Sequence, residues 1–161
     1  MCLLSNDIYP SIAENDIECY KVVKMVCGQP LTPYMNLPIE KDVIDGKNCF
    51  CANDVKKAIF NDLYSLNEVG GGYIHTFSSA EEAKQCILYN TTAFNFIYNG
   101  IAFVIFKCII PKGTEYYSGY CENGNLYNVL YKDRKNMPLN SYASEKIKFV
   151  EELTVTKAFG Y

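Results

Sequence analysis

The chain has 161 residues, of which 49% are hydrophobic and 20% are charged. This length and composition predict a single folded domain over residues 1–161 and exclude an intrinsically disordered chain. The net charge is −3 and Arg134 is the only Arg among fifteen cationic residues, which argues against nucleic acid binding and against bidentate recognition of phosphate.

The cysteines bear on metal binding and on the cellular compartment. The eight of them contain no CxxC pair, and His75 is the only His, so a zinc site would need four scattered thiolates. We therefore expect no metal site. Met1 to Leu4 lead directly into a polar segment without a secretory signal, and no apolar run approaches the ~20 residues that span a bilayer. The sequence predicts a cytoplasmic protein with reduced thiols and no membrane association.

The first third of the chain predicts one clear strand. Residues 1–16 are polar and interrupted by proline, and we expect an irregular lead-in. Residues 17–27 are rich in Val, Ile and Tyr, which is typical of a strand, and Gly28 follows as a turn. Three prolines between residues 30 and 38 suit an extended edge or a loop. A short apolar segment follows at residues 49–52.

Two helices are predicted in the middle of the chain. Apolar residues recur at helical spacing from Asn53 or Asp54 to Leu66. Three consecutive glycines then precede a short strand at residues 73–77. A second helix begins at the next two serines, because both are followed three residues later by a glutamate in the pattern of a capping box.

The second half of the chain predicts the centre of the sheet. Residues 91–98 indicate a strand, and Asn99-Gly100 a hairpin turn. Ile101 to Ile110 are apolar on both faces except for one charge, so we expect a central strand paired on both sides. Residues 116–140 are polar and rich in turn residues, and residues 144–153 alternate like a half-buried strand. The sequence therefore predicts an α+β fold with a largely antiparallel sheet and two or three short helices.

Few residues stand out as chemically active. His75 could act as a general base, contact a ribose or form only a local hydrogen bond. The glycines at 70–72 do not form a phosphate loop, because no GK[ST] motif follows them. Of the fourteen tyrosines, several border the predicted turns, and their rings could stack on a base, a sugar or a protein partner. The alternative is that this Tyr-rich rim reflects codon usage alone.

Four segments together carry a resemblance to a known family. They are CYKVV (19–23), YIHTFSSAEEA (73–83), FKCIIPKGTEYYSG (106–119) and YASEKIKFVEEL (142–153). Their order resembles the ADP-ribosyltransferases, whose strands carry a Tyr-Arg pair, a Ser-Thr-Ser motif before a helix, a Pro-x-Gly end and a Glu-x-Glu motif. The resemblance implies a small, split-sheet fold. The IPKGT…YASEKI pattern is also similar to that of small proteins of gut bacteria and their phages.

The chain departs from the family pattern where the family does its chemistry. Lys21 stands at the position of the NAD-binding Arg, and Thr76-Phe77-Ser78 stand at the Ser-Thr-Ser position. Ser144-Glu145-Lys146 replace the Glu-x-Glu motif, so the catalytic carboxylate is either displaced to Glu145 or replaced by Lys146. Transfer chemistry would lose its main electrostatic support without that carboxylate. The departures therefore favour a binder over a transferase.

We predict from this resemblance a binding protein for a nucleotide-like small molecule, NAD-like or a cyclic nucleotide, with no catalytic residue and no resident cofactor. The predicted ligand-binding residues are Tyr20, Lys21, His75, Thr76, Ser78, Tyr142, Ser144 and Glu145. Abundant Lys, Asn, Ile and Tyr are typical of AT-rich genomes, and a phage protein that sequesters a host defence signal in the host cytoplasm would fit. Two alternatives stay open: an ADP-ribosyltransferase-like or other nucleotide-processing enzyme, and a protein-binding accessory factor.

Overall fold

A computed structural model gives the fold and describes residues 3–5, 7–33, 35–52, 59–61, 67–69, 72–93, 101–121 and 139–153. The elements in chain order are β1 (Leu3–Ser5), β2 (Ser11–Ile12), β3 (Ile17–Val26), β4 (Gln29–Leu31), α1 (Lys41–Ile44), β5 (Phe50–Cys51), β6 (Ile59–Asn61), β7 (Asn67–Val69), β8 (Ile74–Phe77), α2 (Ala80–Ala93), β9 (Ile101–Ile110), β10 (Glu115–Gly119), β11 (Ser141–Ser144) and β12 (Lys146–Leu153). All described strand pairings are antiparallel, which confirms the predicted α+β class.

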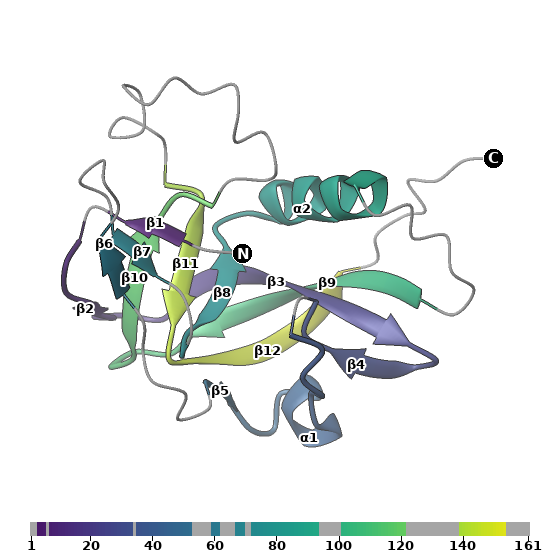
Figure 1. Ribbon diagram of the computed structural model, residues 1–161. Helices are drawn as coiled ribbons and strands as arrows, with labels where there is room; N and C mark the ends of the chain where they lie inside the picture. The colour runs from purple at the N-terminus through teal and green to yellow at the C-terminus, as the bar shows by residue number, and fades with distance from the viewer. Residues whose placement is uncertain are drawn as a thin grey trace.

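The strands form two sheets (Figure 1). The larger one has the order β2-β10-β11-β8-β3-β9-β12-β5, and β4 pairs with β3 beside it. The smaller one has the order β1-β7-β6, and a bridge between Leu4 and Tyr120 joins it to the end of β10. Strands β3 and β9 come from distant parts of the sequence and lie at the centre of the larger sheet.

Strand β9 is the central strand that its apolar sequence predicts. It pairs with β3 over its whole length, from Ile110 opposite Ile17 to Ile101 opposite Val26. On the other side, β12 pairs with residues 105–109. Within the described chain, residues 101–104 have β3 alone as a partner, and Ala102 there is exposed. The prediction of pairing on both sides therefore holds for the second half of the strand.

The larger sheet narrows between β3 and β8. These two strands share a single paired position, Tyr20 opposite Phe77, whereas β8 and β11 pair over four positions. Figure 1 shows β8, β10 and β11 running at a steep angle to β3, β9 and β12. The sheet thus consists of two halves that meet at one narrow junction, and the β11–β12 connection passes from one half to the other.

Each face of the sheet has its own apolar core. Helix α2 packs its buried residues Ala83, Cys86 and Ile87 against one face, together with Val22 and Ile105. The opposite face carries a larger core that includes the residues of α1 and its approach. Its buried members are Ala13, Cys19, Val23, Ile39, Val43, Ile74, Phe106, Cys108, Ile110, Ile147 and Phe149. Figure 1 accordingly shows α2 and α1 on opposite sides of the sheet.

Two glycines occupy positions with positive φ that connect neighbouring elements. The β3–β4 turn has positive φ at both central residues, 49° at Cys27 and 80° at Gly28, which is the backbone of a two-residue hairpin. Gly46 follows α1 with φ of 73°, and a Cβ there would lie 2.6 Å from the carbonyl oxygen of Phe149. Only glycine allows this segment to lie directly on β12.

Four sequence predictions of secondary structure are wrong in part. The lead-in contains β1 and β2, and residues 115–119 form strand β10 between β2 and β11. Residues 59–61 are not helical but pair with β7, because β1 holds β7 in place. Residues 91–93 continue α2 instead of starting a strand. The rest of the helix expected at 53–66, and Asn99-Gly100, lie outside the described residues.

Candidate functional site

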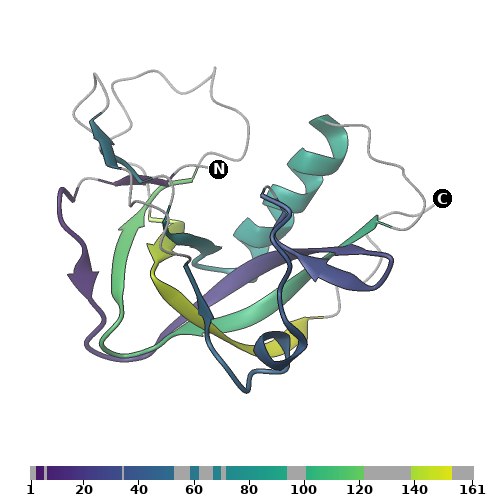
Figure 2. The same ribbon diagram turned by 60° about the horizontal axis from the view of Figure 1, so that its bottom comes forward.

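The predicted ligand-binding residues come from three neighbouring strands. Strand β8 lies between β3 and β11, and Thr76 is directly opposite Tyr142. Tyr20 and Lys21 lie on β3 beside β8, while Ser78 and Glu145 lie just beyond the ends of β8 and β11. Figure 2 shows these strands where the two halves of the sheet meet. The structure therefore places the predicted residues on or next to adjacent strands, with Ser78 and Glu145 at opposite ends of the β8–β11 pair.

That region has two faces, and the predicted residues divide between them. Tyr20 packs with the core under α2, whereas Tyr142 packs with the core on the α1 side. Lys21 is paired with Phe106, which belongs to the α1-side core. Adjacent residues of a strand point to opposite faces, so Tyr20 and Lys21 do not contact a ligand from the same side. The prediction of a strand over residues 17–27 already implied this division.

Lys21 is buried and engaged within the protein. Its side chain is in the interior, and its Nζ donates a hydrogen bond of 2.8 Å to the carbonyl oxygen of His75. Burial lowers the pKa of this ammonium to about 8, and the nearby thiols of Cys108, Cys86 and Cys19 act in the opposite direction with smaller effect. Lys21 thus joins β3 to β8 beside their single paired position.

Tyr20 belongs to a charged group that the sequence analysis missed. Its hydroxyl donates a 2.5 Å hydrogen bond to Glu18 Oε1, and Lys107 Nζ lies 2.6 Å from Glu18 Oε2. The hydrogen bonds from Lys107 and Tyr20 lower the pKa of Glu18, and Glu18 in turn raises the pKa values of Lys107 and Tyr20. Lys107 was visible in the sequence as the one charge in an apolar strand.

Asn140 connects the strand ends near the start of α2, and no local signal pointed to it. Its Oδ1 accepts hydrogen bonds from the backbone N–H of Cys121 (2.9 Å) and from the hydroxyl of Ser141 (2.8 Å). Its Nδ2 donates a hydrogen bond to Glu82 Oε2 at 3.3 Å. Its backbone carbonyl oxygen accepts a hydrogen bond from the backbone N–H of Ser78 at 2.8 Å. This buried amide joins β10, β11 and α2.

Ser144 of the predicted site, and Ser79 next to Ser78, have structural contacts. Ser79 caps α2, since its Oγ accepts the backbone N–H of Glu82 at 3.2 Å, which is the serine half of the second predicted capping box. Ser144 is buried, and its Oγ donates to the carbonyl oxygen of Lys146 at 3.3 Å. The backbone of Glu145 bonds to Glu115 and Ala52 between β11 and β12. Glu145 therefore marks the point where the chain passes between the halves of the sheet.

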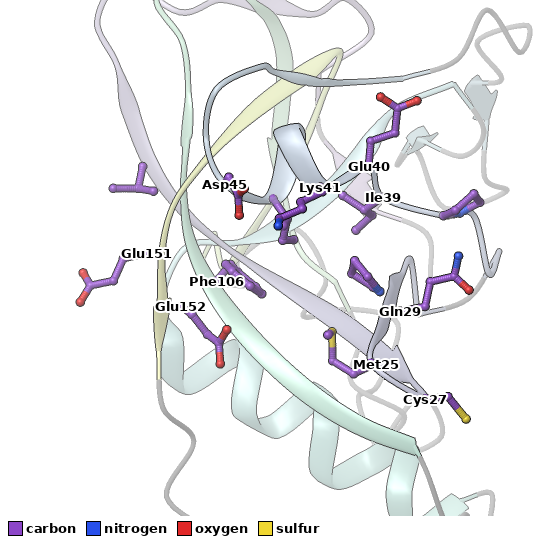
Figure 3. Close-up of a pocket in the computed structure, with 15 residues that line it drawn as sticks. Met25, Cys27, Gln29, Ile39, Glu40, Lys41, Asp45, Phe106, Glu151 and Glu152 are labelled. Carbon is purple, nitrogen blue, oxygen red and sulfur yellow. The ribbon is translucent and has the colours of Figure 1, made fainter.

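A separate groove of about 890 Å³ lies on the α1 side of the sheet (Figure 3). Apolar residues from β3, β9 and α1 form its floor, among them Met25, Phe106 and Ile44. Its charged lining residues are Glu40, Lys41, Asp45, Glu151 and Glu152. The described lining includes none of the eight predicted ligand-binding residues. The sequence analysis missed this groove because its walls come from four separate segments.

Comparison with known proteins found no matching protein-family model, curated protein or solved structure. Across the described ranges, no group of three or more His, Cys, Asp or Glu side chains is arranged to hold a metal ion. Neither helix is long and apolar enough, over its described residues, to cross a bilayer.

Proposed function

We propose that the chain is a binding protein for a nucleotide-like small molecule, built on an ADP-ribosyltransferase-like fold. The observation that carries this proposal is the narrow junction between β3 and β8. The strands with the family-like motifs, β3, β8 and β11, are neighbours there, and β3 and β8 share only one paired position. The proposed ligand would bind where this split interrupts the sheet.

Tyr20 is the residue best suited to contact a base. Its ring is partly exposed at the junction, and the hydrogen bond to Glu18 fixes the position of its hydroxyl. A fixed tyrosine ring is a stacking surface that loses little conformational entropy on binding. Lys107 adds a partly exposed cation on the same face, held by Glu18. Lys21, which the sequence analysis predicted to bind the ligand, contributes instead to the junction itself.

A binder is favoured over a transferase by the residues at the β11–β12 connection. Ser144, Glu145 and Lys146 provide one carboxylate where the family pattern has two. The Ser144 hydroxyl is bonded to the backbone of Lys146, so it does not replace the missing group. Stabilisation of a positively charged ribose in transfer chemistry depends on that carboxylate. A phage protein that sequesters a host nucleotide signal is a biological role compatible with reversible binding.

The test is calorimetry of the whole chain against NAD, cyclic nucleotides and nucleoside triphosphates. We expect saturable binding of at least one of them without NAD consumption. Tyr20→Ala should weaken it by roughly 5- to 150-fold, the equivalent of ~1–3 kcal/mol for a stacked base. Tyr9→Ala is the matched control, because Tyr9 is 80% exposed and lies away from the junction.

Three results would contradict the proposal. If no member of the panel bound, the proposal of a nucleotide-like ligand would be rejected and the protein-binding alternative would be favoured. Equal binding by wild type and Tyr20→Ala would remove the stacking site. NAD hydrolysis that Glu145→Gln abolishes would replace the binder with an enzyme.

A further inference from the structure

We infer that the groove on the α1 side binds an extended peptide segment that carries both basic and apolar side chains. This site is separate from the junction at β3 and β8, because the lining of the groove includes no residue proposed there for the nucleotide. The argument rests on the charge of the rim, the apolar floor and the open edge of β12.

The rim of the groove is acidic on both sides. Glu40 and Asp45 lie on the α1 side and Glu152 on the β12 side, against a single cation of the described lining, Lys41, while the neighbouring Glu151 points away from Phe106 (Figure 3). All four acidic residues are exposed. Of these, Glu40, Asp45 and Glu152 form no ion pair with any described residue, and Glu151 lies opposite Lys107. A phosphate group would be repelled here, whereas Lys or Arg side chains would be attracted.

The floor between the two acidic sides is apolar. Figure 3 shows Phe106 between Asp45 and Glu152, with Met25 further along the floor. Phe106 is buried and packs edge-on against Phe149, with ring centroids 5.3 Å apart. This ring is therefore held rigidly. A ligand that matched the groove would place apolar groups on Met25 and Phe106 and cations towards the acidic rim.

Strand β12 favours a peptide over a small organic cation. Its pairing with β5 stops at Ile147 and the Gly46 segment lies against Phe149, so residues 150–153 have no second strand on their outer side within the described chain. Strand β12 has a bulge between Phe149 and Glu151, and Val150 within it is 52% exposed. Beyond the bulge, Glu152 is paired with Phe106 and its side chain points to the same face of the sheet. An extended peptide could contact the free strand edge and the floor together, whereas a small cation in this open groove would remain largely in solvent.

The experiment uses the whole chain and a fluorescein-labelled ten-residue peptide of alternating Lys and Leu, followed by fluorescence anisotropy. We expect saturable binding that weakens with added salt. Asp45→Asn/Glu152→Gln should weaken it about three- to tenfold, as expected for two solvent-exposed charge contacts. The matched control is Glu14→Gln/Glu81→Gln, which changes the net charge equally at exposed positions outside the groove lining and should leave the affinity within about twofold.

Several outcomes would overturn the inference. Equal weakening by the control variant would mean that net charge alone attracts the peptide. If a Glu-Leu peptide bound equally well, the acidic rim would not contribute to recognition. If a Lys-Ser peptide bound equally well, the apolar floor would not contribute. Displacement of the peptide by an equal concentration of hexylammonium would identify a small cation as the occupant. Each result is independent of the nucleotide titrations, so the two proposals can fail separately.

Discussion

Lys21 shows how a single residue can be recognised in the sequence and yet have a different role in the fold. The sequence indicates a cation beside Tyr20 on a strand, and the structure places it there. Its burial depends on the packing of β8 and the α1-side core, which come from elsewhere in the chain. Asn140 is the opposite case. Its contacts to Cys121 and Glu82 depend on tertiary structure alone, so no local pattern indicates them.

The burial of Lys21 predicts a specific dependence of stability on pH. The ammonium has a pKa of about 8 in the folded protein and an ordinary value of 10.5. Between these values the unfolded chain binds more protons than the folded one, so the free energy of unfolding rises with pH across this window. Below pH 8 both states are protonated and the penalty for the buried charge is fully present. Lys21→Met should remove this pH-dependent contribution.

The measurement is urea unfolding of wild type and Lys21→Met at pH 7.5 and 9.5. Wild type should gain roughly 2 kcal/mol relative to the variant between the two pH values, from a pKa difference of this size. Comparing the two proteins cancels the titration of tyrosines and cysteines. The control is Lys24→Met, at a partly exposed position on the same strand. The difference in the free energy of unfolding between wild type and this variant should not change between the two pH values. A pH-independent difference between wild type and Lys21→Met would contradict the assigned burial.

At the scale of elements, the sequence predicts strands well where their own residues determine their burial. Strands β3, β9 and β12 are long, and their apolar patterns match the faces that they bury. The misassigned elements are short or depend on distant partners. Strand β6 has three residues and exists because β7 pairs with it, and β10 is polar in sequence yet lies between β2 and β11. Apolar spacing alone does not identify such partners.

Strand β9 should be among the slowest parts of the chain to exchange its amide hydrogens. Residues 105–109 are paired with both β3 and β12, so exposure of their amides requires the two longest strand pairings to open. Strand β2 is the internal comparison, because it has two exposed residues and pairs with β10 alone in the described structure. Hydrogen exchange followed by mass spectrometry should show the difference. Exchange in residues 105–109 as fast as in β2 would contradict the central position of β9.

At the scale of the whole molecule, the burial of each cysteine shows which parts of the chain lie in the apolar cores. Seven of the eight are described, and all seven carry free thiols. Cys19, Cys86, Cys108 and Cys121 are buried in the apolar cores, whereas Cys27 and Cys51 are exposed. Burial raises the pKa of Cys19 to about 12, and it raises that of Cys108 as well. Since the thiolate is the reactive form, burial protects these thiols both sterically and electrostatically.

Alkylation with iodoacetamide should therefore occur in two kinetic classes. In the native protein at pH 8, peptide mapping should show rapid labelling of Cys27 and Cys51, with the four buried thiols labelled at least ~100-fold more slowly, at a rate limited by opening of the fold. In denaturant without reductant, intact mass should show eight adducts, because the sequence predicts that every cysteine is reduced. Fewer than eight adducts would indicate a disulfide and contradict the predicted reducing compartment. Native labelling of Cys19 or Cys108 as fast as that of Cys27 would show that the α1-side core does not form as described.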